Sequence, residues 1–351
     1  MKKILDRIFV DGLSGMAQGL FATLIIGTII QQIGTFAGGE MGNVIYMIGK
    51  TAAGLTGAGI GTGVARKLDA GHLVIVSAGV VGMIGAFAGD LMSGEMLVDG
   101  NLVLAGPGEP LGAFVAAYVA IELGILVSGR TRLDIILTPL VCISAGAAAG
   151  LLVGPPISGF MAWLGSLINW GTEQQPLLMG IVVSVLMGMI LTLPISSAAL
   201  GVILNLSGLA AGAATVGCCC NMIGFAVASW RENKFSGFLA QGIGTSMLQV
   251  PNIVRHPQIW IPAIFSSAVL GPVGTMLFHM TNNATGSGMG TAGLVGPLMT
   301  WQVMTQTESG AVVLLKILLI QFLLPAVLTL LASEFMRKKK WIHPGDMKLE
   351  M

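Results

Sequence analysis

The stretch from Thr192 to Pro297 decides the fold, because it is apolar enough to lie in a bilayer and yet is interrupted repeatedly. The interruptions read TLPISS at 192–197, CCCN at 218–221, QVPN at 249–252 and TNNATG at 281–286. Where a helix breaks in hydrocarbon, its backbone N–H and C=O groups need partners from protein or from a water-filled cavity. Short spans interrupted by glycine and proline are typical of the solute site of a transporter. We therefore expect the function to reside in this stretch.

The composition of the whole chain indicates an integral membrane protein. Of its 351 residues, 54% are hydrophobic and 9% are charged, and the mean hydropathy is +0.87. Soluble domains carry about 25% charged residues, so too few charges remain here to cover a water-facing surface. The net charge of +1 gives no indication of nucleic-acid binding, and none is expected.

The four cysteines indicate neither a disulfide framework nor a metal site. Cys142 lies in a predicted helix, and Cys218–Cys220 are adjacent. Successive side chains of a helix diverge by about 100°, so three in a row cannot all face one metal. We expect small packing residues, with a redox or soft-metal role as the alternative. No cofactor, metal site or catalytic residue is predicted.

Apolar runs long enough to cross a bilayer, about 17–25 residues, predict an all-α, polytopic integral membrane protein with about eight spans. The runs lie near 15–34, 43–65, 72–92, 111–128, 133–153, 177–193, 259–280 and 311–332. Lysine and arginine cluster in the loops at 66–67, 130–132, 231–234 and 255 and at both ends of the chain. The positive-inside rule then places both termini in the cytoplasm, and we expect a bacterial inner membrane.

Simple alternation of spans fails in the second half, and this failure predicts two re-entrant hairpins. Residues 198–229 and 235–254 each begin and end on the cytoplasmic side, because basic residues follow both segments. We expect the hairpin tips near Gly208–Gly212 and near Gly244.

Residues 157–170 predict an amphipathic helix along the outer interface, after a span that ends at Gly154-Pro155-Pro156. The chain then divides into a scaffold of five spans (1–154), an interface helix with a linker (155–175), a solute-binding transport domain with the hairpins (176–336) and a basic cytoplasmic tail (337–351). We expect the tail to be a solvated cap that contacts anionic lipid.

Polar side chains in or beside the interruptions are the candidates for substrate contacts. They are Pro194, Ser196, Ser197, Asn221, Ser246, Gln249, Asn252, His279, Asn282, Asn283, Thr285 and Ser287. For the serines after Pro194 the alternative is helix N-capping, and for Asn221 it is a hydrogen bond between helices. The group from 279 to 287 is alternatively an exposed loop, although residues 288–296 stay apolar, as a chain dipping into a cavity does.

Glu122 lies within a predicted span and is the exception among the charged residues. A carboxylate that faces lipid costs a few kcal/mol, so we expect Glu122 to face the interior of the bundle. It either takes part in proton coupling or pairs with a neighbour in a packed scaffold or a dimer interface.

The pattern from Pro176 to Pro272 resembles enzyme IIC, the membrane subunit of bacterial sugar phosphotransferase systems, and is nearest to the fructose-type branch. Pro194–Ala199 stands where that branch has P-V-N-K-A-A, Cys220–Ala228 corresponds to M-V-P-P-L-G-M-A-L-A, and Thr245–Pro251 corresponds to I-T-E-G-A-I-P, with Pro257 and Pro262 keeping the spacing. Nearly the whole chain is also similar to a divergent group of stand-alone enzyme-IIC-like proteins, regarded as membrane toxin regulators of the perfringolysin-regulator type.

The resemblance implies a homodimeric sugar permease with cytoplasmic phosphocarrier subunits as partners, but the chain departs from the pattern at key positions. The family's Asp falls on Ile190, its Asn-Lys pair on Ser196 and Ser197, and its Glu on Met247. In the family that Glu holds the sugar hydroxyls that receive the phosphoryl group. Phosphoryl transfer needs an oriented acceptor and charge-stabilising partners, and methionine supplies neither.

These observations predict a membrane permease of the enzyme IIC type that binds a small polar solute, a sugar or a similar molecule, and translocates it by alternating access. Because the acceptor site is not intact, the chain is at most the membrane subunit of a sugar phosphotransferase. The alternatives are a solute-sensing membrane regulator and an ion-coupled secondary transporter that uses Glu122.

Overall fold

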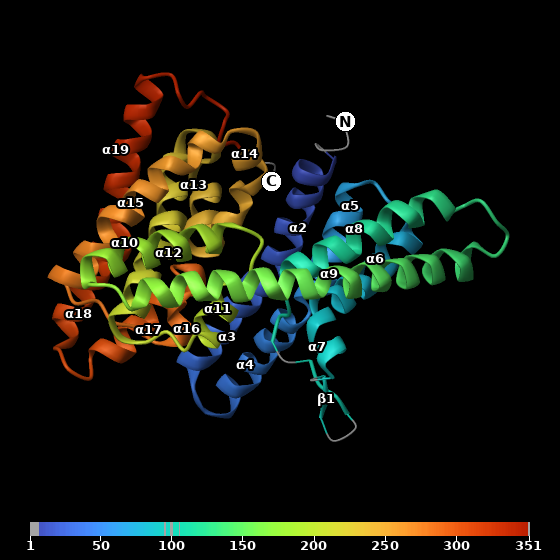
Figure 1. Ribbon diagram of the computed structural model, residues 1–351, viewed down its shortest axis with the longest axis horizontal. Coiled ribbons are helices and arrows are strands. Elements are labelled where there is room, and N and C mark those ends of the chain that lie inside the picture. Colours follow the sequence, from blue (N-terminus) through green and yellow to red (C-terminus); the bar gives the residue numbers. More distant parts are fainter. Residues whose placement is uncertain (1–6, 95, 99–100, 105, 350–351) are drawn as a thin grey trace. The chain divides into compact units, whose positions relative to one another are not determined.

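The computed structural model describes residues 7–94, 96–98, 101–104 and 106–349, and the described chain is almost entirely helical (Figure 1). The exception is a ladder of two short antiparallel strands, β1 (Leu97–Val98) and β2 (Asn101–Leu102). Within the described residues, six helices are long and apolar enough to cross a membrane: 7–37, 110–127, 134–172, 208–228, 257–277 and 310–338. The predicted all-α, polytopic fold is confirmed, while the count of eight spans stays a prediction.

The chain divides into two compact units, Met1–Met161 (unit 1) and Ala162–Met351 (unit 2). Large apolar side chains are exposed on both, such as Leu152 (77% exposed) in unit 1 and Leu277 (72% exposed) in unit 2. Side chains of this size are seldom so exposed to water in such numbers, whereas lipid tails accept them at no cost. The roles of scaffold and transport domain stay predictions.

Unit 1 is a bundle in which small residues allow helices to approach closely. It contains η1 (Arg7–Gly12), α2 (Leu13–Leu20), η2 (Phe21–Ile25), α3 (Ile26–Ala37), α4 (Gly39–Gly54), α5 (Thr56–Lys67), α6 (His72–Ala86), α7 (Ala88–Ser93) and α8 (Pro110–Val127). The first four of these are continuous, and α4 packs back along α3. Glu122 of α8 accepts a hydrogen bond from Arg7 Nε at 2.7 Å. The carboxylate therefore has a neighbour as its partner, which favours the structural alternative for Glu122.

No break in the helix accompanies the predicted end of a span at Gly154-Pro155-Pro156, because α9 runs continuously from Asp134 to Thr172, and where the chain leaves the membrane stays a prediction. Each proline removes only one backbone donor, and its fixed φ is helical, so two such losses leave most of the i to i−4 bonds of a long helix in place. Residues 157–170 are helical, as predicted, and Leu164 and Ile168 are buried while Trp163 is exposed. This amphipathic segment is the second half of α9 rather than a separate helix.

Unit 2 continues after α9 with long helices interrupted by short and irregular ones. The elements are α10 (Pro176–Thr192), α11 (Ser197–Ile203), α12 (Gly208–Ala228), α13 (Trp230–Leu239), η3 (Ala240–Gly244), η4 (Ser246–Gln249), α14 (Val250–Arg255), η5 (Pro257–Trp260), α15 (Ile261–Pro272), η6 (Val273–Leu277), α16 (Ala284–Ser287), η7 (Ala292–Leu294), α17 (Val295–Met304), α18 (Gly310–Ile317), η8 (Leu318–Leu323) and α19 (Leu324–Lys338). The interruptions fall in the stretch between Thr192 and Pro297, where the sequence predicts them.

The central element of unit 2 is α12, which packs against α10, α15 and α19. From Ala211 to Ala228 every residue except Val227 is buried. Its glycines permit this packing, because a Cβ at Gly217 would overlap the backbone carbonyl of Ser184 on α10. The segment of the first predicted hairpin contains the seven-residue α11 and the 21-residue α12, which is long enough to cross a membrane, and the re-entrant hairpins stay a prediction. The second contains a break at Thr245, which is extended between η3 and η4.

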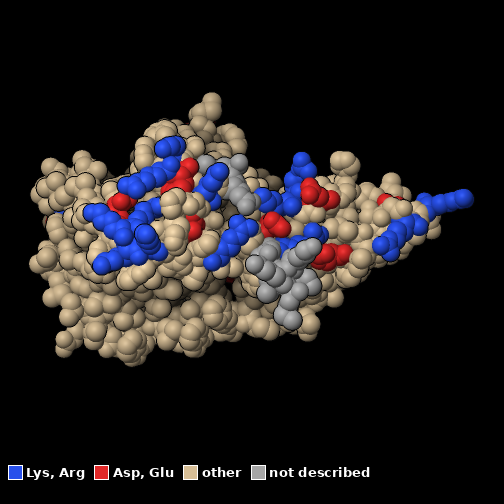
Figure 2. All heavy atoms as spheres, turned by 90° about the horizontal axis from the view of Figure 1, so that it is seen from above, with Lys and Arg blue, Asp and Glu red and all other residues tan. Residues whose placement is uncertain are grey.

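The expectation that residues 337–351 form a solvated cap is wrong for the described part of this tail. After α19 the chain crosses over α13 and ends beside α14 (Figure 1). Ile342 and Met347 are buried in a cluster with Phe225, Ile253 and Met336. Their apolar side chains gain more from this cluster than from water. Basic side chains nevertheless gather at this end of unit 2 (Figure 2), and lysines 338–340 and 348 are exposed.

We expect Gly217→Ala to lower the free energy of unfolding by about 1–3 kcal/mol, because the added methyl group forces α10 and α12 apart. The measurement is thermal unfolding of the purified protein in detergent. Gly54→Ala is the matched control, since nothing lies within 4 Å of a Cβ there. Equal midpoints for the two variants would contradict the close packing of α10 and α12.

Candidate functional site

Polar side chains in unit 2 form three hydrogen-bonded networks, which meet α12 or its end at different positions along the helix axis. These positions are those of Thr215, Asn221 and Ser229, and all three residues are fully buried. A helix rises about 1.5 Å per residue, so the first two lie about 9 Å apart along the axis and the last two about 12 Å apart. We call them the Thr215, Asn221 and Ser229 networks.

The Asn221 network joins α10, α12, η4 and α15 around one amide side chain. Asn221 Oδ1 accepts hydrogen bonds from Trp260 Nε1 at 2.9 Å and from Thr192 Oγ1 at 3.2 Å. Its Nδ2 donates to Ser267 Oγ at 3.3 Å, and Thr192 Oγ1 lies 2.8 Å from Ser246 Oγ. The predicted residues Asn221 and Ser246 are therefore brought together, with Thr192 as the link between them.

The Thr215 network is built around Asn282, in the segment before α16. Asn282 Nδ2 donates to Thr215 Oγ1 at 2.8 Å and to Thr300 Oγ1 at 3.0 Å, and its Oδ1 accepts from the N–H of Asn283 at 2.8 Å. Gln321 Nε2 donates to Thr300 Oγ1 at 2.8 Å, while Gln321 Oε1 has no hydrogen-bond partner among the described residues. This buried oxygen on the π-helical η8 is an acceptor that a bound hydroxyl would satisfy.

The Ser229 network is a row of buried amides that ends at the tail. Gln241 Nε2 donates to Ser229 Oγ, Gln249 Nε2 donates to Gln241 Oε1, and Asn252 Nδ2 donates to Gln249 Oε1, each at 2.8 Å. Gln249 and Asn252 also donate to backbone carbonyl groups of Met347 and Lys348, each at 3.0 Å. In this conformation the amide donors of both predicted site residues are thus engaged by the protein itself.

The segment from 279 to 296 lies mostly inside unit 2 rather than outside it. Asn282 and Ser287 are buried, as are Gly290 and Thr291 beyond them, whereas His279 and Thr285 are exposed. Thr291 Oγ1 donates to the carbonyl oxygen of Gly242 in η3, which connects this segment to the second predicted hairpin. The apolar run 288–296 therefore enters the interior of unit 2.

Hydrogen bonds at the start of α11 and α16 show what Ser197 and Asn283 contact. Ser197 Oγ donates to the carbonyl oxygen of Gly288 at 2.6 Å, so its hydroxyl ties α11 to the 288–296 segment. Asn283 Oδ1 accepts from the N–H of Gly286 at 2.9 Å and does cap α16. Pro194 and Ser196 are half-buried in the connection between α10 and α11. The predicted site residues are therefore spread over several clusters.

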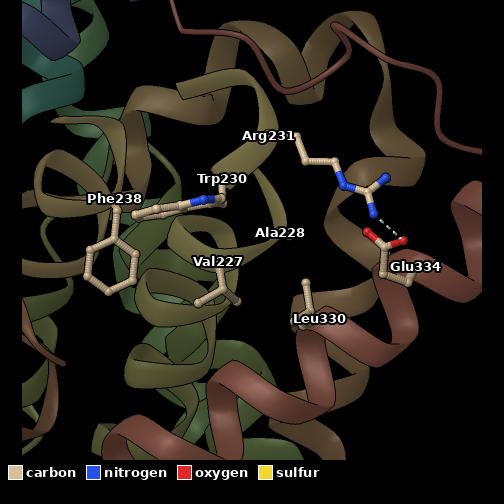
Figure 3. Close-up of a pocket in the computed structure, with 7 residues that line it drawn as sticks. All are labelled: Val227, Ala228, Trp230, Arg231, Phe238, Leu330 and Glu334. Carbon is tan, nitrogen blue, oxygen red and sulfur yellow. Dashed lines mark hydrogen bonds and ion pairs between the residues drawn. The ribbon is translucent and has the colours of Figure 1, made fainter. Parts of the chain in front are cut away.

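A pocket of about 440 Å³ opens beside the end of α12 but contains none of the predicted residues. Val227, Ala228, Trp230, Phe238 and Leu330 give it a mostly apolar lining. Figure 3 shows Arg231 and Glu334 paired on one side of it and the rings of Trp230 and Phe238 on the other, with 2.9 Å between Arg231 Nη2 and Glu334 Oε2. Its apolar lining suits a hydrocarbon better than a sugar, and we do not assign it to the solute.

No group of three or more His, Cys, Asp or Glu side chains among the described residues is arranged to hold a metal ion. Cys218–Cys220 are fully buried thiols in the middle of α12. Cys218 Sγ lies 3.5 Å from the backbone oxygen of Met187, a packing contact with α10.

The family comparison concerns nearly the whole chain. The model of the family described as phosphotransferase system, EIIC, matches residues 10–349. The chain belongs to this EIIC family. EIIC is a membrane sugar-permease component of the phosphotransferase system, so this EIIC protein is a multi-pass membrane protein with a sugar-permease role. No curated protein sequence matches the chain.

Sequence reasoning missed several residues of the networks in this EIIC protein. They are Thr192, Thr215, Ser229, Gln241, Trp260, Ser267, Thr300 and Gln321. Serine and threonine are common in membrane helices and bond to their own backbone, so their presence alone gives no signal. Gln241 and Gln321 carried a usable signal, because a glutamine amide inside an apolar run needs partners.

We expect Asn221→Ala to lower the free energy of unfolding by about 1–3 kcal/mol, because Trp260 Nε1 and the Thr192 hydroxyl lose a buried partner. A double-mutant cycle with Trp260→Phe, followed by thermal unfolding in detergent, measures the coupling between Asn221 and Trp260. The control is Asn169→Ala, at an exposed position of α9. Additive effects of Asn221→Ala and Trp260→Phe would contradict the hydrogen bond.

Proposed function

We propose that this EIIC protein binds a small uncharged polar solute, a sugar or a sugar-like molecule, and moves it across the membrane by alternating access without phosphorylating it. The observation that carries the proposal is Met247. It lies at the position of the family's sugar-binding Glu, is 8% exposed, and directly follows Ser246 of the Asn221 network. A thioether neither accepts a proton nor orients a hydroxyl for phosphoryl transfer.

The absence of charge around the Asn221 network supports an uncharged solute. In the described part of unit 2, the charged side chains that are less than one-tenth exposed are Glu232, Arg337 and Asp346, and all three contact the tail. The networks at Thr215 and Asn221 consist of hydroxyl, amide and indole groups. Such groups bind sugar hydroxyls, whereas a charged solute would be left without a counter-charge.

The broken elements of unit 2 support movement of the solute by alternating access. Thr192 is the last residue of α10, Ser246 begins η4 after the extended Thr245, and Trp260 ends η5. The Asn221 network therefore joins the ends of short elements to the continuous α12, an arrangement in which the short elements can move while α12 stays fixed.

Three further points belong to the proposal. The protein is a homodimer in a bacterial inner membrane, as the family resemblance implies, and its basic end of unit 2 faces the cytoplasm. The substrate contacts are made by the predicted residues Asn221 and Ser246, together with Thr192 and Ser267. Phosphocarrier subunits are not required for uptake, because Met247 provides no carboxylate to hold the sugar hydroxyl that would accept the phosphoryl group.

The test is uptake of radiolabelled hexoses and hexitols by purified protein in liposomes, with and without phosphorylated carrier protein. We expect unmodified solute inside the liposomes in both cases. Recovery of a sugar phosphate that depends on the carrier would overturn the proposal. Binding without uptake would show that the protein is a solute sensor instead.

A substitution in the Asn221 network should weaken binding of the transported solute. We expect Ser246→Ala to raise its Kd by about tenfold, because one hydrogen-bonding hydroxyl is lost at the site. Ser166→Ala removes an exposed hydroxyl from α9 and is the control. If the two variants bind the solute equally well, the site lies elsewhere.

A further inference from the structure

Amide side chains of unit 2 hold three consecutive residues of the C-terminal tail, Met347–Leu349, through their backbone groups. Asn233 Nδ2 donates to the carbonyl oxygen of Met347 at 2.8 Å, and Asn233 Oδ1 accepts from the N–H of Leu349 at 2.8 Å. The carbonyl oxygens of Met347 and Lys348 also accept from Gln249 and Asn252. Every one of these four bonds uses a backbone group of the tail. The amides therefore form a groove that recognises the backbone groups of a peptide segment.

Two apolar side chains and one carboxylate fix the register of the tail in this groove. Met347 is fully buried and Leu349 is 7% exposed, whereas Lys348 between them points to solvent. The carboxylate of Asp346 accepts from the N–H of His343 at 2.8 Å and lies 3.7 Å from His256 Nε2. Asp346 and Met347 belong to a turn, in which the N–H of Lys348 donates to the carbonyl oxygen of Gly345 at 3.0 Å, and the chain continues from this turn to Leu349.

The connection to α19 leaves the tail able to detach without unfolding a helix. Lysines 338–340 are exposed, and so are residues 343–345 directly before Asp346. Gly345 has a φ of 97°, a conformation that glycine adopts without strain. Ile342 lies between these exposed residues and is buried, so the segment from Asp346 to Leu349 is joined to α19 by a connection with one buried side chain.

The groove belongs to the same short elements that carry the Asn221 network. Gln249 is the last residue of η4, and Ser246, which contacts Thr192, is the first. Asn252 lies on the adjoining α14. Because Asn233 of α13 holds the same tail residues, a movement of η4 and α14 away from α13 has to break bonds to the tail.

We propose that the amides of Asn233, Gln249 and Asn252 form a peptide-binding groove whose ligand is the chain's own segment Asp346–Leu349, and that the bound segment holds η4 and α14 closed until it is released. The second half of this inference rests on the proposed transport function, whereas the first half does not. The docked tail is then a tethered inhibitor of solute passage.

Docking is tested first, by the reactivity of single cysteines with a maleimide in the full-length protein in lipid nanodiscs. The four native cysteines are buried, and wild-type protein gives the background. We expect Leu349→Cys to react about tenfold more slowly than Lys348→Cys, because Leu349 is covered while the tail is bound. Equal rates would overturn the groove.

Release is tested next with Met347→Asp, which places a carboxylate in the apolar cluster, and with Lys348→Asp as the matched control at an exposed position. We expect Met347→Asp to raise the labelling rate of Leu349→Cys by about tenfold and Lys348→Asp to leave it unchanged. Asn233→Asp, which removes the donor to Met347, gives a second release variant if Met347→Asp does not fold. Unchanged labelling in the folded release variant would overturn the groove.

The gating role is tested by solute uptake in the same variants. We expect the initial rate for the release variant to exceed that of wild type by about threefold or more. Faster labelling without faster uptake would overturn the inhibitory role. If no protein takes up any solute while the labelling results hold, the transport function fails and the groove stands.

Discussion

A polar group inside a membrane protein must find its partner within the protein, and in unit 2 those partners are arranged along α12. The continuous helix provides Thr215 and Asn221, while broken elements bring Thr192, Ser246, Trp260 and Asn282 to them. Thr192, Trp260 and Asn282 each bond to a fixed point on α12, and Ser246 is connected to Asn221 through Thr192. The breaks in the surrounding elements are therefore tolerated because the unbroken α12 provides hydrogen-bond partners for them.

Glycine allows this arrangement, since amide and hydroxyl side chains reach one another only when helices lie close together. At Gly217 the backbone of α12 contacts that of α10, and Asn221 one turn later reaches Thr192 and Ser267. A bulkier residue at 217 would widen the gap by more than a hydrogen bond tolerates. In the centre of unit 2 the hydrogen bonds between side chains therefore depend on the close packing of the helices.

The positions of the interruptions, and two residues of the Asn221 network, could be predicted from the sequence because proline, glycine and clustered polar residues leave a local signal. These residues are Asn221 and Ser246. Other features depend on distant contacts that local patterns do not encode. The continuity of α9 through Pro155 and Pro156 depends on how well a long helix absorbs two lost donors. The burial of Met347 depends on amides about a hundred residues earlier in the chain, and the tail itself reads only as basic and polar.

The placement of Leu349 in a groove also bears on how this protein is handled in the laboratory. Purification tags are often fused to the C-terminus of membrane proteins because it is assumed to lie free in solution. Here the backbone N–H of Leu349 is held by Asn233, so a sequence fused close behind Leu349 would adjoin the groove. A tag at that end would pull on the groove, so preparations tagged at opposite ends are expected to differ in conformation before any solute is added.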